Sequence, residues 1–149
     1  MLLLAHNIRS FHNVGAFFRI ADAFDVEKIY LTGYTGTPPH KDIAKVALGS
    51  EHRVAWEKQD NLQELIGRLK QEGIIIAALE TGVVSVPIQT AALRLDQSTT
   101  ALILGSEVEG VDDEILAMAD IVVSIPMIGQ KKSLNVSVAC GIAVYGLTR

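Results

Sequence analysis

Three stretches of this sequence combine glycine, amide and charged side chains in patterns that suit a binding or catalytic site. They cover residues 13–24, 102–110 and 125–139. In the second stretch an apolar run leads into Gly105 and Gly110, and glycine lets a backbone approach a ligand closely and expose its N–H groups. Glu107 and Glu109 in the same turn disfavour a phosphate and favour a neutral or cationic ligand. Taken alone, this pattern is more typical of a plain loop.

The third stretch has the same form, an apolar run followed by a loop and a helical segment. Ser133 is predicted to cap the helix, and Asn135 falls in the first helical turn. Asparagine is disfavoured there, so its side chain is either solvated or used. Lys131 and Lys132 come just before the cap. They can meet a phosphate backbone, although lysines in loops are more often simply solvated.

Arg19 lies off the apolar stripe of the helix predicted in the first stretch. One interpretation is a surface arginine beside Asp22, three residues further on, a pair that contributes little to stability. The other is a guanidinium directed at a phosphate or at a developing alkoxide. The residues by themselves favour the surface interpretation.

The elements that must position these stretches follow from alternating apolar runs and helical patterns. Strands are predicted at residues 2–6, 28–32, 74–79, 100–104 and 121–125, with less support at 53–56. Such short continuous apolar runs are typical of strands buried on both faces of a parallel sheet. Helices are predicted after Asn13 as a cap, over 61–71 with Gly73 ending it, and over a segment whose first turn holds Asp112, Asp113 and Glu114. This order predicts an α/β fold, a mostly parallel sheet with helices on both faces.

The segment 133–147 has almost no polar face, and a helix that is apolar all round is buried or lies in an interface. Gly141 and Gly146 each weaken a helix by about 1 kcal/mol relative to alanine. We therefore expect another backbone to pack closely there. An ordinary core helix and a dimer contact both remain open. Cys140, the one cysteine, is expected to be a small core residue and excludes an internal disulfide.

The composition limits the classes of protein. The 149 residues suit one domain with one core, and 49% apolar with 20% charged residues excludes a disordered chain. No run reaches the roughly 18 apolar residues of a membrane span, which together with the single cysteine fits the cytoplasm. The mean hydropathy of +0.31 suggests apolar surface covered by a partner. The net charge of −4 argues against nucleic-acid binding except through a local basic patch.

In order, spacing and residue types, the three stretches resemble the SpoU (TrmH) family of RNA 2′-O-ribose methyltransferases, in the SPOUT class. The resemblance runs from residue 7 to 147 and includes segments 33–35 and 45–51. It implies an α/β domain whose C-terminal part forms a deep trefoil knot, which composition and periodicity do not predict. It also implies methyl transfer from S-adenosylmethionine to a ribose 2′-hydroxyl of tRNA or rRNA, by a homodimer in which one subunit's arginine serves the other subunit's pocket.

The same resemblance assigns roles to individual residues. Arg19 would activate the ribose hydroxyl, and because its pKa exceeds about 12 we expect it to orient the hydroxyl and stabilise an alkoxide rather than act as a general base. The other catalytic residues would be Asn13, Glu107, Ser133 and Asn135. The cofactor pocket would be lined by Leu79, Glu80, Thr81, Gly105, Ile125, Met127, Ser133 and Leu134. Ser106 departs from the asparagine common in the family; its hydroxyl can keep a loop hydrogen bond but offers one donor where the amide offers two.

RNA contacts are expected from exposed basic and imidazole side chains, and they would depend strongly on salt. The candidates are Arg9, His12, Lys41, Lys45, Arg53, Lys131 and Lys132. We expect a single domain over residues 1–149 with no appended RNA-binding domain. Two other functions stay open, a non-catalytic RNA- or S-adenosylmethionine-binding relative and a methyltransferase with another acceptor. A metal enzyme is not expected, because the four histidines, His6, His12, His40 and His52, lack ligand spacing.

Overall fold

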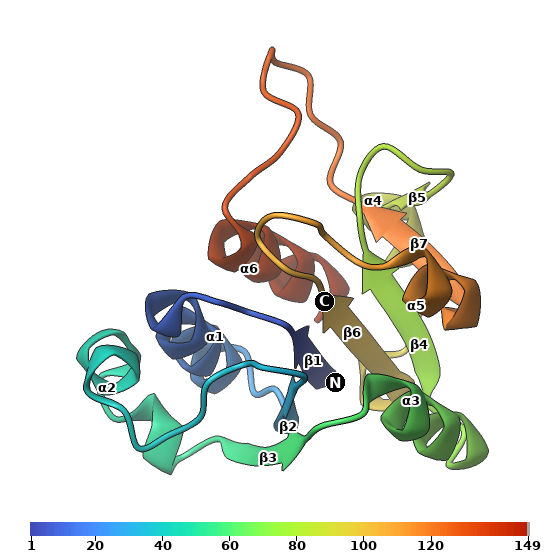
Figure 1. The fold of residues 1–149 in the computed structure, drawn as a ribbon. Helices are drawn as coiled ribbons and strands as arrows, with labels where there is room; N and C mark the ends of the chain where they lie inside the picture. Colours follow the sequence, from blue (N-terminus) through green and yellow to red (C-terminus); the bar gives the residue numbers. More distant parts are fainter. Residues whose placement is uncertain (149) are drawn as a thin grey trace.

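Seven strands form one sheet in the computed structural model, which describes residues 1–148 (Figure 1). The strands are β1 (Leu2–His6), β2 (Lys28–Thr32), β3 (Ala55–Gln59), β4 (Ile75–Leu79), β5 (Val86–Pro87), β6 (Thr100–Leu104) and β7 (Ile121–Ser124). Their order across the sheet is β3-β2-β1-β6-β4-β7-β5, and every ladder between them is parallel. The predicted mostly parallel α/β sheet is confirmed. In residues 1–148 no helix is long and apolar enough to cross a membrane.

Both faces of this sheet are covered, as the continuous apolar runs predicted. Successive side chains of a strand point to opposite faces, so Leu3 and Ala5 join one core and Leu2 and Leu4 another. The first core is closed by α1 (Phe11–Ala23), α2 (Lys41–Ala47), α4 (Ile88–Ala91) and α6 (Val136–Leu147). The second is closed by α3 (Leu62–Gln71) and α5 (Asp113–Met118).

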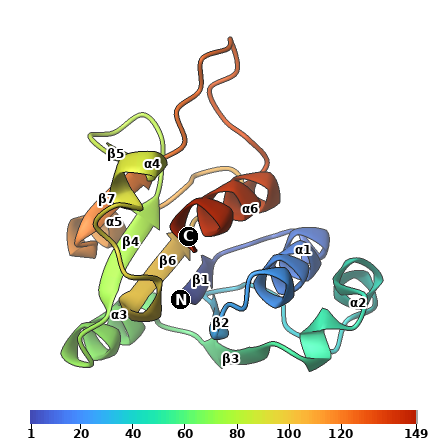
Figure 2. The same cartoon turned by 180° about the vertical axis from the view of Figure 1, so that it is seen from behind.

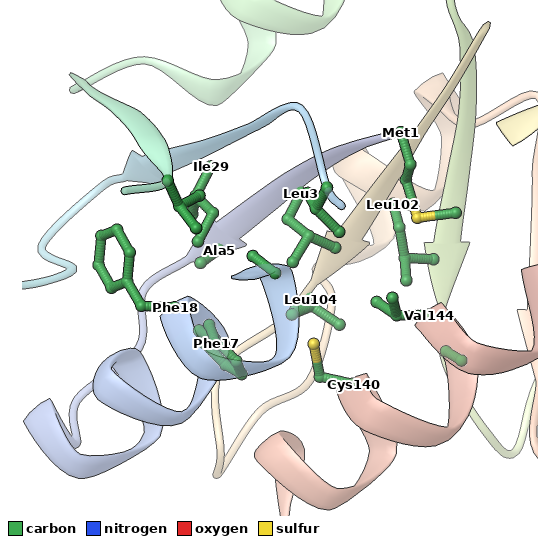
Figure 3. Close-up of a cluster of buried hydrophobic side chains, with 14 of the residues drawn as sticks. Met1, Leu3, Ala5, Phe17, Phe18, Ile29, Leu102, Leu104, Cys140 and Val144 are labelled. Carbon is green, nitrogen blue, oxygen red and sulfur yellow. The ribbon is translucent and has the colours of Figure 1, made fainter. Parts of the chain in front are cut away.

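The first core joins α1 and α6 to the central strands. Figure 3 shows Phe17 of α1 and Cys140 and Val144 of α6 packed among the side chains of β1 and β6. The exposed fraction of each of these three side chains is 0%. Cys140 is thus a core residue, as predicted, and burial raises the pKa of its thiol.

Helix α6 has a buried side and an exposed side, so within one chain it is not an ordinary core helix, and the dimer contact stays a prediction. Cys140, Ala143, Val144 and Leu147 are buried. Val138, Ile142 and Tyr145 are 51%, 40% and 53% exposed. The expected close backbone at the two glycines is also wrong, because the nearest atoms to a Cβ added at either position belong to the side chains of Ile20 and Ile88.

Three predicted boundaries shift for local reasons. The strand expected at 53–56 begins at Ala55, because Arg53 and Val54 still donate to the carbonyl of Ser50 in the preceding 3₁₀ turn, η1 (Ser50–His52). Helix α1 is capped by Ser10, whose Oγ accepts from the backbone N–H of Asn13, so Asn13 is the third helical residue and not the cap. Helix α6 is capped by Asn135 and not by Ser133.

Other boundaries agree with the prediction. Asn61 caps α3, and its Oδ1 accepts from the N–H of Glu64. Gly73 follows that helix at a φ of +82°, a conformation in which glycine carries no steric penalty. Asp112 precedes α5. Helices α2 and α4, strand β5 and the short 3₁₀ turns η1 and η2 (Gln97–Thr99) had not been predicted. They are too short to show a clear periodicity.

The topology brings three loops to one edge of the sheet. Strand β4 lies between β6 and β7 and is parallel to both, so the carboxyl ends of the three strands lie at the same edge. The long loop between β7 and α6 extends from this edge, and α6 returns beside α1 in both views (Figures 1 and 2). In open α/β sheets ligands bind beyond this edge.

Candidate active site

A cavity of about 560 Å³ lies at the carboxyl ends of β4, β6 and β7. All eight residues expected to bind the cofactor line it, namely Leu79, Glu80, Thr81, Gly105, Ile125, Met127, Ser133 and Leu134. Glu107 and Asn135 from the expected catalytic set line it too. The structure therefore brings the second and third chemical stretches together around one space.

Further residues of the same loops complete the wall and had not been assigned to the cofactor pocket or the catalytic set. They are Leu104, Ser106, Val108, Glu109, Gly110, Val136 and Ala139. Most are immediate chain neighbours of the predicted residues, so the signal that could have found them is continuity along each loop.

The turn after β6 needs both of its glycines. Ser106 and Gly110 exchange backbone hydrogen bonds with N···O distances of 3.0 Å in both directions. A Cβ on Gly105 would lie 2.3 Å from the carbonyl carbon of Gly110, so no larger residue fits. Gly110 itself has a φ of +71°, which favours glycine. The turn is held as a narrow loop whose backbone faces the cavity.

Ser106 closes this turn with its side chain. Its Oγ accepts hydrogen bonds from the N–H groups of Val108 at 3.3 Å and Glu109 at 3.0 Å. The loop hydrogen bond expected of the serine is confirmed. The departure from asparagine at this position therefore leaves the wall of the cavity intact.

Glu80 joins two of the three loops. Its carboxylate accepts from the N–H of Thr81 at 2.7 Å and from the N–H of Val111 at 2.8 Å. Gly110 allows this approach, since a Cβ there would lie 2.3 Å from Oε2 of Glu80. The carboxylate thereby fixes the width of the cavity between β4 and β6.

Glu107 joins the turn after β6 to the start of α1. Its two carboxylate oxygens accept from the backbone N–H groups of Arg9 and Ser10 and from Nδ2 of Asn13, each at 3.0 Å. Burial alone would raise the pKa of this carboxyl, but the three hydrogen bonds outweigh it and lower the pKa below its usual value. Glu107 is therefore an ionised anchor for the N-terminal turn of α1.

Asn13 connects all three chemical stretches. Its Nδ2 donates to Glu107, and its Oδ1 accepts from Nδ2 of Asn135 at 3.4 Å. Asn135 in turn caps α6, because its Oδ1 accepts from the N–H of Ser137 at 2.9 Å. Asn13 is only 8% exposed, whereas Glu107 and Asn135 are exposed at the cavity, so the network is buried at its centre alone. The side-chain network thus sets α1 and α6 against the cavity.

Arg19 does not line the cavity of its own chain. Arg19 lies six positions after Asn13, so its side chain points about 120° away from that of Asn13 around α1. Arg19 is exposed. The pairing with Asp22 considered from the sequence is not what forms. Asp22 instead accepts from Nε of Arg53 at 3.0 Å and from Oγ of Ser50 at 2.9 Å, and these bonds lower the pKa of its carboxyl. Arg19 is presented on the outer surface of α1.

The residues expected to contact RNA fall into two exposed groups. Lys131 and Lys132 lie in the loop that forms one rim of the cavity, and Arg9 and His12 flank the start of α1. Lys41, Lys45 and Arg53 lie on α2 or just after the 3₁₀ turn η1. Within residues 1–148 no three histidine, cysteine or acidic side chains come together as a metal site.

Comparison with known sequences places these features among RNA-modifying proteins. The model of the SpoU rRNA methylase family matches residues 1–145. The chain is 31% identical over 150 residues to the 23S rRNA (guanosine-2′-O-)-methyltransferase RlmB of Coxiella burnetii, covering 100% of this chain and 58% of that protein. It is 34% identical over 150 residues to the tRNA (guanosine(18)-2′-O)-methyltransferase of Aquifex aeolicus, covering 100% of this chain and 69% of that protein.

Solved structures agree. The TrmH/SpoU tRNA modifying enzyme of A. aeolicus matches with a TM-score of 0.86 and 33% identity, over 99% of this chain and 73% of that one. An AdoMet-bound rRNA methyltransferase from Sinorhizobium meliloti matches with a TM-score of 0.89 and 25% identity, over 98% of this chain and 54% of that one. This chain spans only part of these proteins, little more than half in the shortest match.

Proposed function

Because the chain belongs to the SpoU rRNA methylase family, we propose that it transfers a methyl group from S-adenosylmethionine to a ribose 2′-hydroxyl of tRNA or rRNA. The observation that carries the proposal is the network at Asn13, which binds both Glu107 and Asn135 beside the cavity. The network joins Asn13 to two residues that lie 94 and 122 positions further along the chain. That such distant residues meet at the mouth of one cavity supports a reaction site there.

The cavity suits the proposed cofactor in size and charge. Pockets for ligands of this size span about 300–1,000 Å³, and this one measures about 560 Å³. Three carboxylates line it, those of Glu80, Glu107 and Glu109, and no lysine or arginine among residues 1–148 does. That balance favours a cationic ligand over a phosphate. When bound, S-adenosylmethionine supplies a methyl group activated by a positively charged sulfur.

In this proposal the chain's own residues act mainly by placement. The backbone of the turn after β6 and of residues 125–135 holds the cofactor, while Asn13, Glu107 and Asn135 fix α1 and α6 beside it. Arg19 orients the 2′-hydroxyl and stabilises the alkoxide as its proton leaves to solvent or to an RNA phosphate. A guanidinium stays protonated in proteins, so it does not remove that proton itself. In-line placement with water excluded accounts for the rest of the rate.

The proposal includes a homodimer, since Arg19 lies outside the cavity of its own chain. The exposed side of α6 carries Val138 and Ile142, and Phe24 at the end of α1 contacts Tyr145 with ring centroids 5.9 Å apart. A contiguous apolar face of this kind favours burial against a second copy. In such a pair the arginine of one subunit serves the cavity of its partner.

The test is incubation of the purified protein with methyl-labelled S-adenosylmethionine and total tRNA or rRNA, followed by nucleoside analysis. We expect label on the ribose, and label on a base would contradict the proposed acceptor. Arg19→Ala is expected to reduce transfer by at least about 100-fold while S-adenosylhomocysteine affinity changes less than about twofold. Arg94→Ala, in the loop after α4, is the matched control and should keep full activity. Loss of cofactor affinity in Arg19→Ala would show a structural role instead.

A further inference from the structure

A second cavity, of about 330 Å³, lies outside the proposed transfer site. It is bounded by the loop before α2, by the first turns of α2 and by η1. Its lining residues are Pro38, Pro39, His40, Lys41, Ile43, Ala44, Glu51 and His52. Most of the lining is apolar, and one buried carboxylate is set among it.

Glu51 is the unusual residue of this cavity. Its side chain is only 6% exposed, and within residues 1–148 its Oε2 has no hydrogen-bond partner. The other oxygen, Oε1, lies 3.6 Å from Nε2 of His52, whose side chain is 81% exposed. A buried carboxylate without donors costs folding free energy, so natural proteins rarely keep one unless a ligand or water satisfies it. A ligand that donates N–H groups to this carboxylate would remove that cost.

The position of the cavity connects it to the helix that carries Asn13 and Arg19. The ring of His40 stacks on the ring of Phe11, with centroids 3.7 Å apart and planes inclined by 13°. Phe11 is the first residue of α1, two positions before Asn13. Helices α1 and α2 are also in close backbone contact at Gly15. A group bound beside His40 is therefore next to the element that positions the proposed reaction.

We propose that this cavity binds a guanine base of the RNA substrate, with Glu51 accepting from its N1–H and N2–H groups. The proposal rests on the function proposed above. Guanine alone among the four bases presents two adjacent N–H donors on its Watson–Crick edge, and a carboxylate offers two parallel acceptors. Single-stranded RNA is commonly recognised through this edge, with the base packed between flat side chains. A base in the cavity can pack against Pro38, Pro39 and His40. The exposed Lys41, which also lines the cavity, can pair with a phosphate of the RNA.

The experiment compares guanosine 5′-monophosphate with inosine 5′-monophosphate, which lacks only the 2-amino group. Calorimetric titrations are run with saturating S-adenosylhomocysteine, so that the first cavity is filled. We expect the guanosine nucleotide to bind about tenfold more tightly, the value of one charge-assisted hydrogen bond. Glu51→Gln should abolish the preference, because its amide replaces one acceptor by a donor. Glu64→Gln, on the exposed side of α3 across the sheet, is the matched control and should keep it.

A second variant tests the cavity without touching the carboxylate. Ala44→Leu fills the space from an exposed helical position and should weaken both nucleotides at least about tenfold while the melting temperature is kept. Equal affinity for the two nucleotides, no binding of either, or a preference that survives Glu51→Gln would overturn the inference. A separate titration with S-adenosylhomocysteine alone reports binding at the first cavity. A protein that binds it and methylates ribose but shows no guanine preference keeps the proposed function and loses this subsite.

Discussion

At the scale of single residues, the site depends on side chains whose work is to hold other parts of the chain. Glu107 accepts three hydrogen bonds from the start of α1, Asn13 links it to Asn135, and Glu80 spans two loops. The role expected of Glu107 as part of the catalytic surroundings is compatible with this, but its visible contacts are those of an anchor. Mutating such a residue should therefore change stability as well as transfer.

Glu107→Gln is predicted to alter the pH dependence of stability. The hydrogen bonds lower the pKa of Glu107 in the folded state below its usual value of 4.5. The ionised carboxylate therefore stabilises the fold above about pH 4.5, and that contribution is lost as the pH falls through the lower, folded-state pKa. Urea unfolding across this range should show wild type more stable than the variant at neutral pH, with the difference shrinking in acid. Glu109→Gln, in the same turn, is the control; a constant difference at every pH would contradict the assignment.

At the scale of elements, α1 is the part whose placement decides the site, since it carries both Asn13 and Arg19. Two sets of contacts hold α1 in place, the hydrogen bonds of Asn13 and the packing against α2. Gly15 makes the second contact possible. A Cβ added there would lie 2.6 Å from the carbonyl oxygen of Ile43 and 2.9 Å from Cβ of Val46. The two helices therefore touch backbone to backbone.

Gly15→Ala is predicted to destabilise the protein even though alanine is the better helix former. The higher helix propensity of alanine alone would raise the free energy of unfolding by roughly 1 kcal/mol. Forcing the two helices apart lowers it by about 1–3 kcal/mol and displaces α1. Gly67→Ala in α3 is the matched control, because a Cβ there meets nothing within 4 Å. Thermal and urea unfolding should show Gly67→Ala more stable than wild type and Gly15→Ala less stable. If both substitutions stabilise alike, α1 and α2 do not pack as closely as described.

At the scale of the whole molecule, Arg19 lies apart from the cavity of its own chain, which favours assembly with a second copy. One chain contains the whole of the cavity proposed to bind the cofactor, but Arg19 does not line it. The apolar outer side of α6 lies beside α1, which carries that arginine. Pairing of two copies through this face is our proposal for completing the site.

Ile142→Asp is predicted to separate the dimer and to abolish methyl transfer together. A carboxylate at a position that is 40% exposed in one chain leaves the fold intact, but it cannot be buried unpaired in an interface. Light scattering should show a monomer, calorimetry should still show S-adenosylhomocysteine binding, and transfer should be lost. Leu93→Asp, which alters an 86% exposed leucine after α4, is the control and should remain a dimer. An active monomer would refute the shared site.

The sequence by itself determined the α/β class and strands β1, β2 and β6, which fall where continuous apolar runs predicted them, and the resemblance over residues 7–147 identified the family. Those features depend on neighbours in the chain. The trefoil knot and the roles of the site residues stay predictions. Only the tertiary structure decided that Asn13 lies within α1 and links Glu107 to Asn135, that α6 is exposed on one side, and that Oε2 of Glu51 is buried without a hydrogen-bond partner in residues 1–148. These contacts join residues up to 122 positions apart, and they depend on how helices pack across the sheet, which no local pattern contains.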